Sequence, residues 1–177
     1  MIDAIWTQER ATHHGAHFDF DEIEVFPKPL QKPRPPIWIG GRSAAAQERA
    51  GRLADGWMPS QCQVSIFDEG VKWVRSTAAT AGRPAPEDFG INAFMAVGRT
   101  DEEAFGYVDQ ALGKRFNGRA ALLDATIAGS PETVIARIRQ YAVVGLNLVD
   151  LKFVPLTLEA NLAQMELVAR EVMPAFA

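Results

Sequence analysis

The stretch Pro35-Pro36-Ile37-Trp38-Ile39-Gly40-Gly41-Arg42-Ser43 decides how this sequence folds. A short apolar run ends in two glycines and leads into an alanine-rich segment, which predicts a strand, a tight turn and a helix. Glycine lets backbone N–H groups approach an anion, and Ser43 can cap a helix whose first turn carries partial positive charge. Gly40, Gly41, Arg42 and Ser43 therefore form a candidate phosphate site, and the alternative is an ordinary strand-to-helix turn.

The pattern of strand, helix and strand recurs beyond this turn, with short connections that favour parallel pairing. Apolar spacing and capping signals predict helices over 43–54, 67–78, 100–112, 130–145 and 158–172, and strands at 37–39, 57–58, 90–97 and 148–154. Residues 113–128 are harder to assign, and we expect a short helix around Arg119 to Thr126 inside a longer loop. The result is an α/β chain of four βα units.

The composition is typical of a compact, enzyme-like domain, since 47% of the residues are hydrophobic and 23% are charged. The net charge is −4 and no long basic run occurs, so nucleic-acid binding is not expected. No apolar stretch is long enough to span a membrane and no signal-peptide pattern opens the chain, so we expect a cytoplasmic protein. Cys62 is the single cysteine, which excludes an intrachain disulfide, and we interpret it as a bystander.

Residues 1–36 are organised differently from residues 37–177 and are expected to form a separate region. Residues 1–9 resemble the tail of a helix, and residues 17–26 alternate apolar and acidic side chains before a proline-rich connection. His13, His14 and His17 could bind a metal in principle, but a polar turn around Gly15 explains them better, so no metal site is predicted.

The strand at 148–154 places Asp150 and Lys152 on one face, because successive side chains of a strand alternate. In a closed barrel that face could be the interior. An internal ion pair between the two side chains is the favoured interpretation, and a ligand contact is the alternative.

Several motifs then occur in an order that identifies a family. They are Phe18-Asp-Phe-Asp-Glu, Pro27-Lys-Pro, Pro35-Pro-Ile-Trp-Ile-Gly-Gly, Ala50-Gly-Arg-Leu-Ala-Asp-Gly-Trp, Gly129-Ser-Pro-Glu-Thr and Val149-Asp-Leu-Lys-Phe. In this order the chain resembles the C-terminal half of the luciferase-like oxidoreductases and monooxygenases that depend on a flavin or a deazaflavin. The resemblance covers nearly the whole sequence.

The resemblance implies half of a (β/α)8 TIM barrel, with the four strands similar to the fifth to eighth. It implies that Gly40, Gly41, Arg42 and Ser43 hold the phosphate of FMN or of the deazaflavin coenzyme F420, and that the substrate is a small molecule. The residues from Phe18 to Glu24 and those of the glycine segment are most similar to the deazaflavin branch, which favours the deazaflavin slightly. No catalytic residue can be carried over, because in this family the other half of the barrel supplies those groups.

Two function classes remain open at the level of sequence. The first is the cofactor-phosphate-binding half of an oxidoreductase, and the second is a non-catalytic half-barrel with a vestigial phosphate site. Unpaired strand edges would favour pairing with another chain, so we expect a homodimer or association with an N-terminal half.

Overall fold

The computed structural model describes residues 1–155 and 157–177. By its contacts the chain divides into two compact units, Met1–Ile37 and Trp38–Ala177. Within the described residues, no helix combines the length and the apolar character that crossing a membrane requires.

The first unit consists of a short helix, α1 (Ile2–Thr7), and an antiparallel hairpin formed by β1 (Ala11–His14) and β2 (Asp19–Ile23). The alternating segment at 17–26 thus contains a strand, β2, whereas β1 had no clear sequence signal. The pairing register shifts between Ala11 and His13, which marks a β-bulge.

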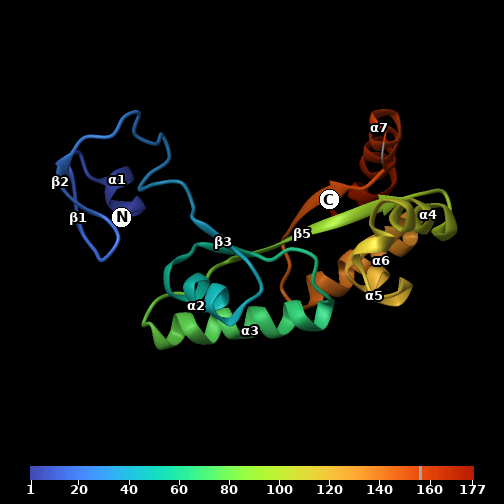
Figure 1. Cartoon of the computed structure of the whole chain (residues 1–177), viewed down its shortest axis with the longest axis horizontal. Helices are drawn as coiled ribbons and strands as arrows, with labels where there is room; N and C mark the ends of the chain where they lie inside the picture. Colours follow the sequence, from blue (N-terminus) through green and yellow to red (C-terminus); the bar gives the residue numbers. More distant parts are fainter. Residues whose placement is uncertain (156) are drawn as a thin grey trace. The chain divides into compact units, whose positions relative to one another are not determined.

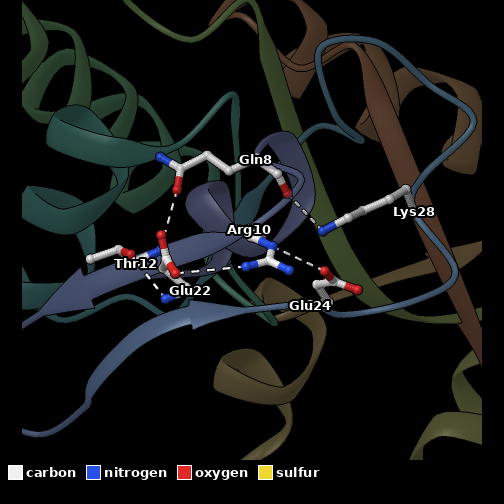
Figure 2. Close-up of polar contacts among 6 residues, drawn as sticks. All are labelled: Gln8, Arg10, Thr12, Glu22, Glu24 and Lys28. Atoms are coloured by element: carbon white, nitrogen blue, oxygen red, sulfur yellow. Dashed lines mark hydrogen bonds and ion pairs between the residues drawn. The ribbon is translucent and has the colours of Figure 1, made fainter.

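Polar contacts hold the bulge in place (Figure 2). Glu22 has a φ of 47°, and its backbone N–H donates to Thr12 Oγ1 at 3.1 Å. Arg10 forms ion pairs with Glu22 and Glu24, at 3.7 and 3.1 Å. Lys28 Nζ donates to the Gln8 carbonyl at 2.7 Å and so ties the proline-rich segment to the end of α1.

The second unit contains one parallel sheet with β5 at its centre. Its strands are β3 (Trp38–Gly40), β4 (Gly56–Met58), β5 (Asp88–Val97), β6 (Thr126–Gly129) and β7 (Leu148–Phe153). Phe94 and Met95 pair with both β6 and β7, so these two strands lie on opposite edges of β5. Asn92 pairs with Asp150 of β7 and bridges to Ser60 after β4, so β4 approaches β5 from the same edge as β6.

The prediction of four strands is wrong, because the sheet of the described chain has five. The missed strand is β6, which lies inside the segment assigned to a helix and a loop. That segment does contain a helix, α5 (Arg119–Asp124), but β6 begins directly after it, with only Ala125 between the two elements.

The other helices confirm the expected α/β order. They are α2 (Ala44–Leu53), α3 (Val64–Thr80), α4 (Asp101–Leu112), α6 (Pro131–Val143) and α7 (Leu158–Leu167), with short turns at Gly113–Arg115, Val168–Val172 and Met173–Phe176. Figure 1 shows α2 and α3 side by side next to the first strands of the sheet.

Hydroxyl side chains set the start of four helices, since Ser43, Thr100, Ser130 and Thr157 each accept a backbone N–H three residues on. At Thr100 the cap differs from a standard capping box in one bond. Glu103 returns its carboxylate to the N–H of Arg99, at 2.8 Å, and not to that of Thr100.

Two apolar cores lie on opposite faces of β5. Ile91, Ala93, Met95 and Val97 face the core built with α2, α3 and α6, whereas Phe94 and Ala96 face α4. In the first core, Trp57 stacks on Phe67 with ring centroids 5.6 Å apart. This packing fixes Trp57 of β4, whose indole reaches the candidate site.

Candidate functional site

The candidate phosphate site lies at the turn between β3 and α2. Gly40 ends β3, and Gly41 has a φ of +103°, which side-chain-bearing residues rarely adopt. A Cβ on Gly41 would also lie 3.0 Å from the Cβ of Ala46. Both constraints require glycine at this position, as expected of a turn that brings backbone close to a ligand or to a helix.

The turn presents a row of free backbone donors. Ser43 Oγ accepts the N–H of Ala46 at 3.2 Å and so caps α2. Within the described chain, the N–H groups of Arg42, Ser43, Ala44 and Ala45 donate to no protein acceptor, and these residues are exposed. Free amides at the positive end of a helix dipole can bind an anion, and water serves them otherwise.

Two contacts join this turn to β4 and to the loop that follows it. The indole Nε1 of Trp57 donates to the carbonyl of Gly41 at 3.0 Å. A guanidinium N–H of Arg42 donates to the carbonyl of Gln61 at 2.8 Å. Neither bond could be predicted from the sequence, because the partner of an indole or guanidinium group depends on how neighbouring strands align.

The loop after β4 is itself tied to β5. Gln61 has a φ of 50°, and its N–H donates to the carbonyl of Asn92 at 3.0 Å. The N–H of Asn92 donates in turn to the carbonyl of Pro59 at 3.0 Å. The carbonyl that holds Arg42 is therefore fixed by the sheet, and the orientation of Arg42 follows from that.

Cys62 lies buried behind this loop, where the hydroxyl of Tyr141 donates to its carbonyl at 2.6 Å. Burial raises the pKa of the Cys62 thiol to about 11, and the nearby charge of Arg42 opposes that rise only in part. Burial likewise raises the pKa of Tyr141 to about 12. Both groups stay neutral near pH 7, so neither is a nucleophile here.

Asp150 and Lys152 share one face of β7, as predicted, but they do not form the expected ion pair. Asp150 accepts a hydrogen bond from Asn92 Nδ2 at 2.6 Å. Lys152 Nζ lies over the ring of Phe94, 5.2 Å from its centroid. Each side chain contacts β5 because adjacent strands offer partners at the same level of the sheet, which sequence alternation within β7 does not reveal.

The histidines of the first unit make local contacts. His14 Nδ1 lies 2.6 Å from Asp19, and its Nε2 lies 3.3 Å from Asp21. In the part of the chain that the structure describes, no three His, Cys, Asp or Glu residues form a group that could hold a metal ion.

The donors at the β3–α2 turn can hold an anionic group, because free backbone N–H groups lie there at the N-terminus of α2. Neither Cys62 nor Tyr141 is an activated nucleophile, and His14 is paired on the hairpin of the first unit. The arrangement therefore supports binding, and it does not reveal a catalytic residue.

Comparison with protein families and known proteins gives consistent matches. Residues 1–148 match the family model described as luciferase-like monooxygenase. An FMNH(2)-dependent dimethylsulfone monooxygenase of Pseudomonas putida is 33% identical over 135 residues, which are 74% of this chain and 37% of that protein. The chain thus spans little more than a third of the length of this relative.

Solved structures show the same fold at lower identity. The coenzyme F420-dependent tetrahydromethanopterin reductase of Methanopyrus kandleri matches with a TM-score of 0.81 and 18% identity, covering 99% of this chain and 61% of the reductase. The oxygenating constituent of 3,6-diketocamphane monooxygenase of Pseudomonas putida, in complex with FMN, matches with a TM-score of 0.72 and 15% identity. That match covers 98% of this chain and 60% of the monooxygenase.

Proposed function

Since the chain belongs to the luciferase-like monooxygenase family, we propose that it supplies the cofactor-phosphate site of a flavin- or deazaflavin-dependent oxidoreductase. The observation that carries this proposal is the β3–α2 turn, where a glycine at positive φ precedes free backbone donors at a helix N-terminus. The phosphate of the cofactor accepts hydrogen bonds from Arg42, Ser43, Ala44 and Ala45 through their backbone N–H groups.

Arg42 adds charge to this site without having to be reoriented. Its guanidinium has five N–H donors, and one of its terminal nitrogens is held by the carbonyl of Gln61. The remaining donors are available to a phosphate oxygen. Trp57 contributes indirectly, because its indole fixes the carbonyl of Gly41 and thereby the direction in which the following N–H groups point.

FMN is the cofactor that we propose for this chain, and coenzyme F420 is the alternative. The relative at 33% identity is named as FMNH(2)-dependent. This observation outweighs the sequence similarity of short motifs to the deazaflavin branch. The structural neighbours include proteins named with either cofactor, so their fold supports both. When bound, a reduced flavin supplies the electrons for monooxygenation of a small organic substrate.

We also propose that the chain works in an assembly, as a homodimer or with a complementary barrel half. In the described sheet, β7 pairs only with β5 and β3 pairs only with β4, so each has a free edge. An apolar cavity of about 690 Å³ lies beside β7, between α6 and the C-terminal turns, and includes Leu146, Val149 and Val172. Free edges and apolar surface favour pairing with another chain.

The experiment compares the affinity of the chain for FMN and for riboflavin, which lacks the phosphate, by flavin fluorescence. We expect FMN to bind at least tenfold more tightly, which corresponds to about 1.4 kcal/mol. Gly41→Val should abolish that difference, because a branched Cβ fits neither the positive φ nor the space beside Ala46.

Gly82→Val is the matched control, since Gly82 also has a positive φ, of +67°. A Cβ placed on Gly82 would have no described atom within 4 Å. It should weaken the fold locally and leave the FMN to riboflavin ratio unchanged. Equal affinity for FMN in the parent and in Gly41→Val would contradict the phosphate site. It would leave an ordinary turn in a non-catalytic half-barrel as the better explanation.

A further inference from the structure

A polar cleft lies where β5 ends, between α4 and α7, and shares no residue with the β3–α2 turn. Its volume is about 240 Å³, which suits a ligand of only a few heavy atoms. The polar side chains that line it are those of Arg99, Glu103, Tyr107, Gln164, Glu166 and Arg170.

Gln164 is the unusual member of this lining because it is only 4% exposed. Its Oε1 accepts the backbone N–H of Val97 at 3.1 Å, which fixes the orientation of the amide. Its Nε2 is then a buried donor with no partner among the described residues. An unsatisfied buried donor costs about 1–3 kcal/mol, so a native protein normally supplies an acceptor.

The way β7 ends gives a structural role to the amide oxygen of Gln164 but none to its NH2 group. The N–H of Val154 still donates to the carbonyl of Met95, after which the chain continues through Pro155 and leaves the sheet. Gln164 Oε1 then serves the next donor of β5, that of Val97, in place of a strand carbonyl. This role needs only an acceptor, and it gives no reason for an NH2 group beside it.

Among the described residues that line the cleft, one cationic side chain has no carboxylate partner. Glu103 accepts the N–H of Arg99 at 2.8 Å and the hydroxyl of Tyr107 at 3.1 Å, so both of its oxygens have donors. The bond to Glu103 raises the pKa of Tyr107, which keeps that hydroxyl protonated. Arg170 pairs with Glu171 at 2.8 Å.

In the described part of the chain, Arg99 has no such carboxylate partner. Across residues 1–155 and 157–177, no carboxylate lies within ion-pair distance of its guanidinium. Arg99 and Gln164, with its unpartnered amide donor, both line this small cleft. Together they match the two needs of a carboxylate, which are positive charge and hydrogen-bond donors.

We propose that this cleft binds a small monocarboxylate, whose oxygens accept from Gln164 Nε2 and from Arg99. The carboxylates of Glu103 and Glu166 face the same cleft and would repel a second negative charge. Monocarboxylates such as acetate are therefore preferred over dicarboxylates such as succinate.

The test follows the side-chain amide signal of Gln164 and the backbone signal of Val97 by nuclear magnetic resonance. The full chain is titrated with sodium acetate, with sodium succinate, and with sodium chloride at matched ionic strength. We expect saturable shifts of both signals with acetate and at least roughly tenfold weaker binding of succinate.

Gln164→Glu is the informative variant, because Glu keeps an oxygen for Val97 and replaces the free NH2 by a second oxygen. It should keep the fold and weaken acetate binding at least tenfold, and Arg99→Gln should weaken it as well. Arg139→Gln, an exposed arginine on α6, is the control and should leave binding unchanged. The proposal is overturned if acetate causes no shift beyond that of chloride, which would leave water as the partner of Nε2. It is also overturned if Gln164→Glu binds acetate as tightly as the parent.

Discussion

Gly70 shows how a single missing side chain shapes this molecule. A Cβ at Gly70, in α3, would lie 2.2 Å from the Cη2 atom of Trp57. The indole therefore occupies the space that any other residue would fill, and from there its Nε1 reaches the carbonyl of Gly41. The helix accepts an unfavourable residue so that the tryptophan can support the turn.

Replacement of Gly70 should have the opposite effect to replacement of Gly106, although both glycines lie within helices. Gly70→Ala should lower the free energy of unfolding by about 1–3 kcal/mol, because the core around Trp57 becomes overpacked. Gly106→Ala, in α4, meets nothing within 4 Å and should raise it by about 0.5–1 kcal/mol. Urea unfolding followed by tryptophan fluorescence measures both, and equal effects of the two variants would contradict this packing.

At the scale of residues, sequence could predict groups whose role is local. Ser43 was predicted as the cap of α2 because a hydroxyl before an alanine-rich run acts on the next turn of its own helix. The pairing of Asp150 with Asn92 could not be predicted in the same way, because 58 residues separate them. The role of the Trp57 indole was missed for the same reason.

Asp101 joins two elements of the molecule, since it begins α4 and contacts the start of α6. Its Oδ1 accepts the backbone N–H of Ser130 at 2.7 Å. That bond, followed by one from the hydroxyl of Thr133, lowers the pKa of Asp101 below its usual value. A carboxyl group with a lowered pKa stabilises the fold above its unfolded-state pKa of about 3.9 and loses that effect as the pH falls through the folded-state pKa.

Asp101→Asn should therefore destabilise the chain in a pH-dependent way. The amide still offers an acceptor to Ser130 but lacks the charge, so the variant should be less stable than the parent near pH 7. The difference in thermal midpoint should shrink as the pH falls below the unfolded-state pKa of about 3.9 and through the lower folded-state pKa of the parent carboxyl. Glu102→Gln removes a charge from the same helical turn and serves as the control. A difference that stays constant over this pH range would rule out the stated role of Asp101.

Among the elements, helices with caps were predictable from the sequence and the buried strand β6 was not. Ser130 and Pro131 mark the start of α6 directly. β6 has only four residues, Thr126–Gly129, all buried, and follows α5 with one residue between them. A short apolar run without alternation fits a buried helix end as well as a strand, so its pairing with β5 became clear only in the sheet.

For the whole molecule, the free sheet edges predict self-association. The chain has a mass of 19.4 kDa, and β7 has an unpaired edge in the described sheet beside the apolar cavity that includes Val149. We expect light scattering at micromolar concentration to give a mass of about twice that of one chain or more. A well-folded species of 19.4 kDa under these conditions would refute the proposed assembly.

The chain alone should show no measurable redox turnover with reduced FMN. It spans 37% of the related dimethylsulfone monooxygenase, and its candidate site offers phosphate donors without a positioned proton donor. Catalysis needs groups held in place around the reacting atoms. Absorbance at the flavin band measures turnover, first for the chain and then after addition of a separately expressed N-terminal half of a family member. Robust turnover by the chain alone would show that its own assembly completes an active site.

We propose that the turn after β3 binds the cofactor phosphate through its backbone N–H groups. Nuclear magnetic resonance of the amide groups tests it most directly, because the donors of Arg42, Ser43, Ala44 and Ala45 report on the phosphate one by one. We predict that FMN shifts these four signals saturably and that riboflavin at the same concentration leaves them in place. If FMN leaves the four signals unmoved, or if riboflavin moves them equally, the phosphate is not held at this turn.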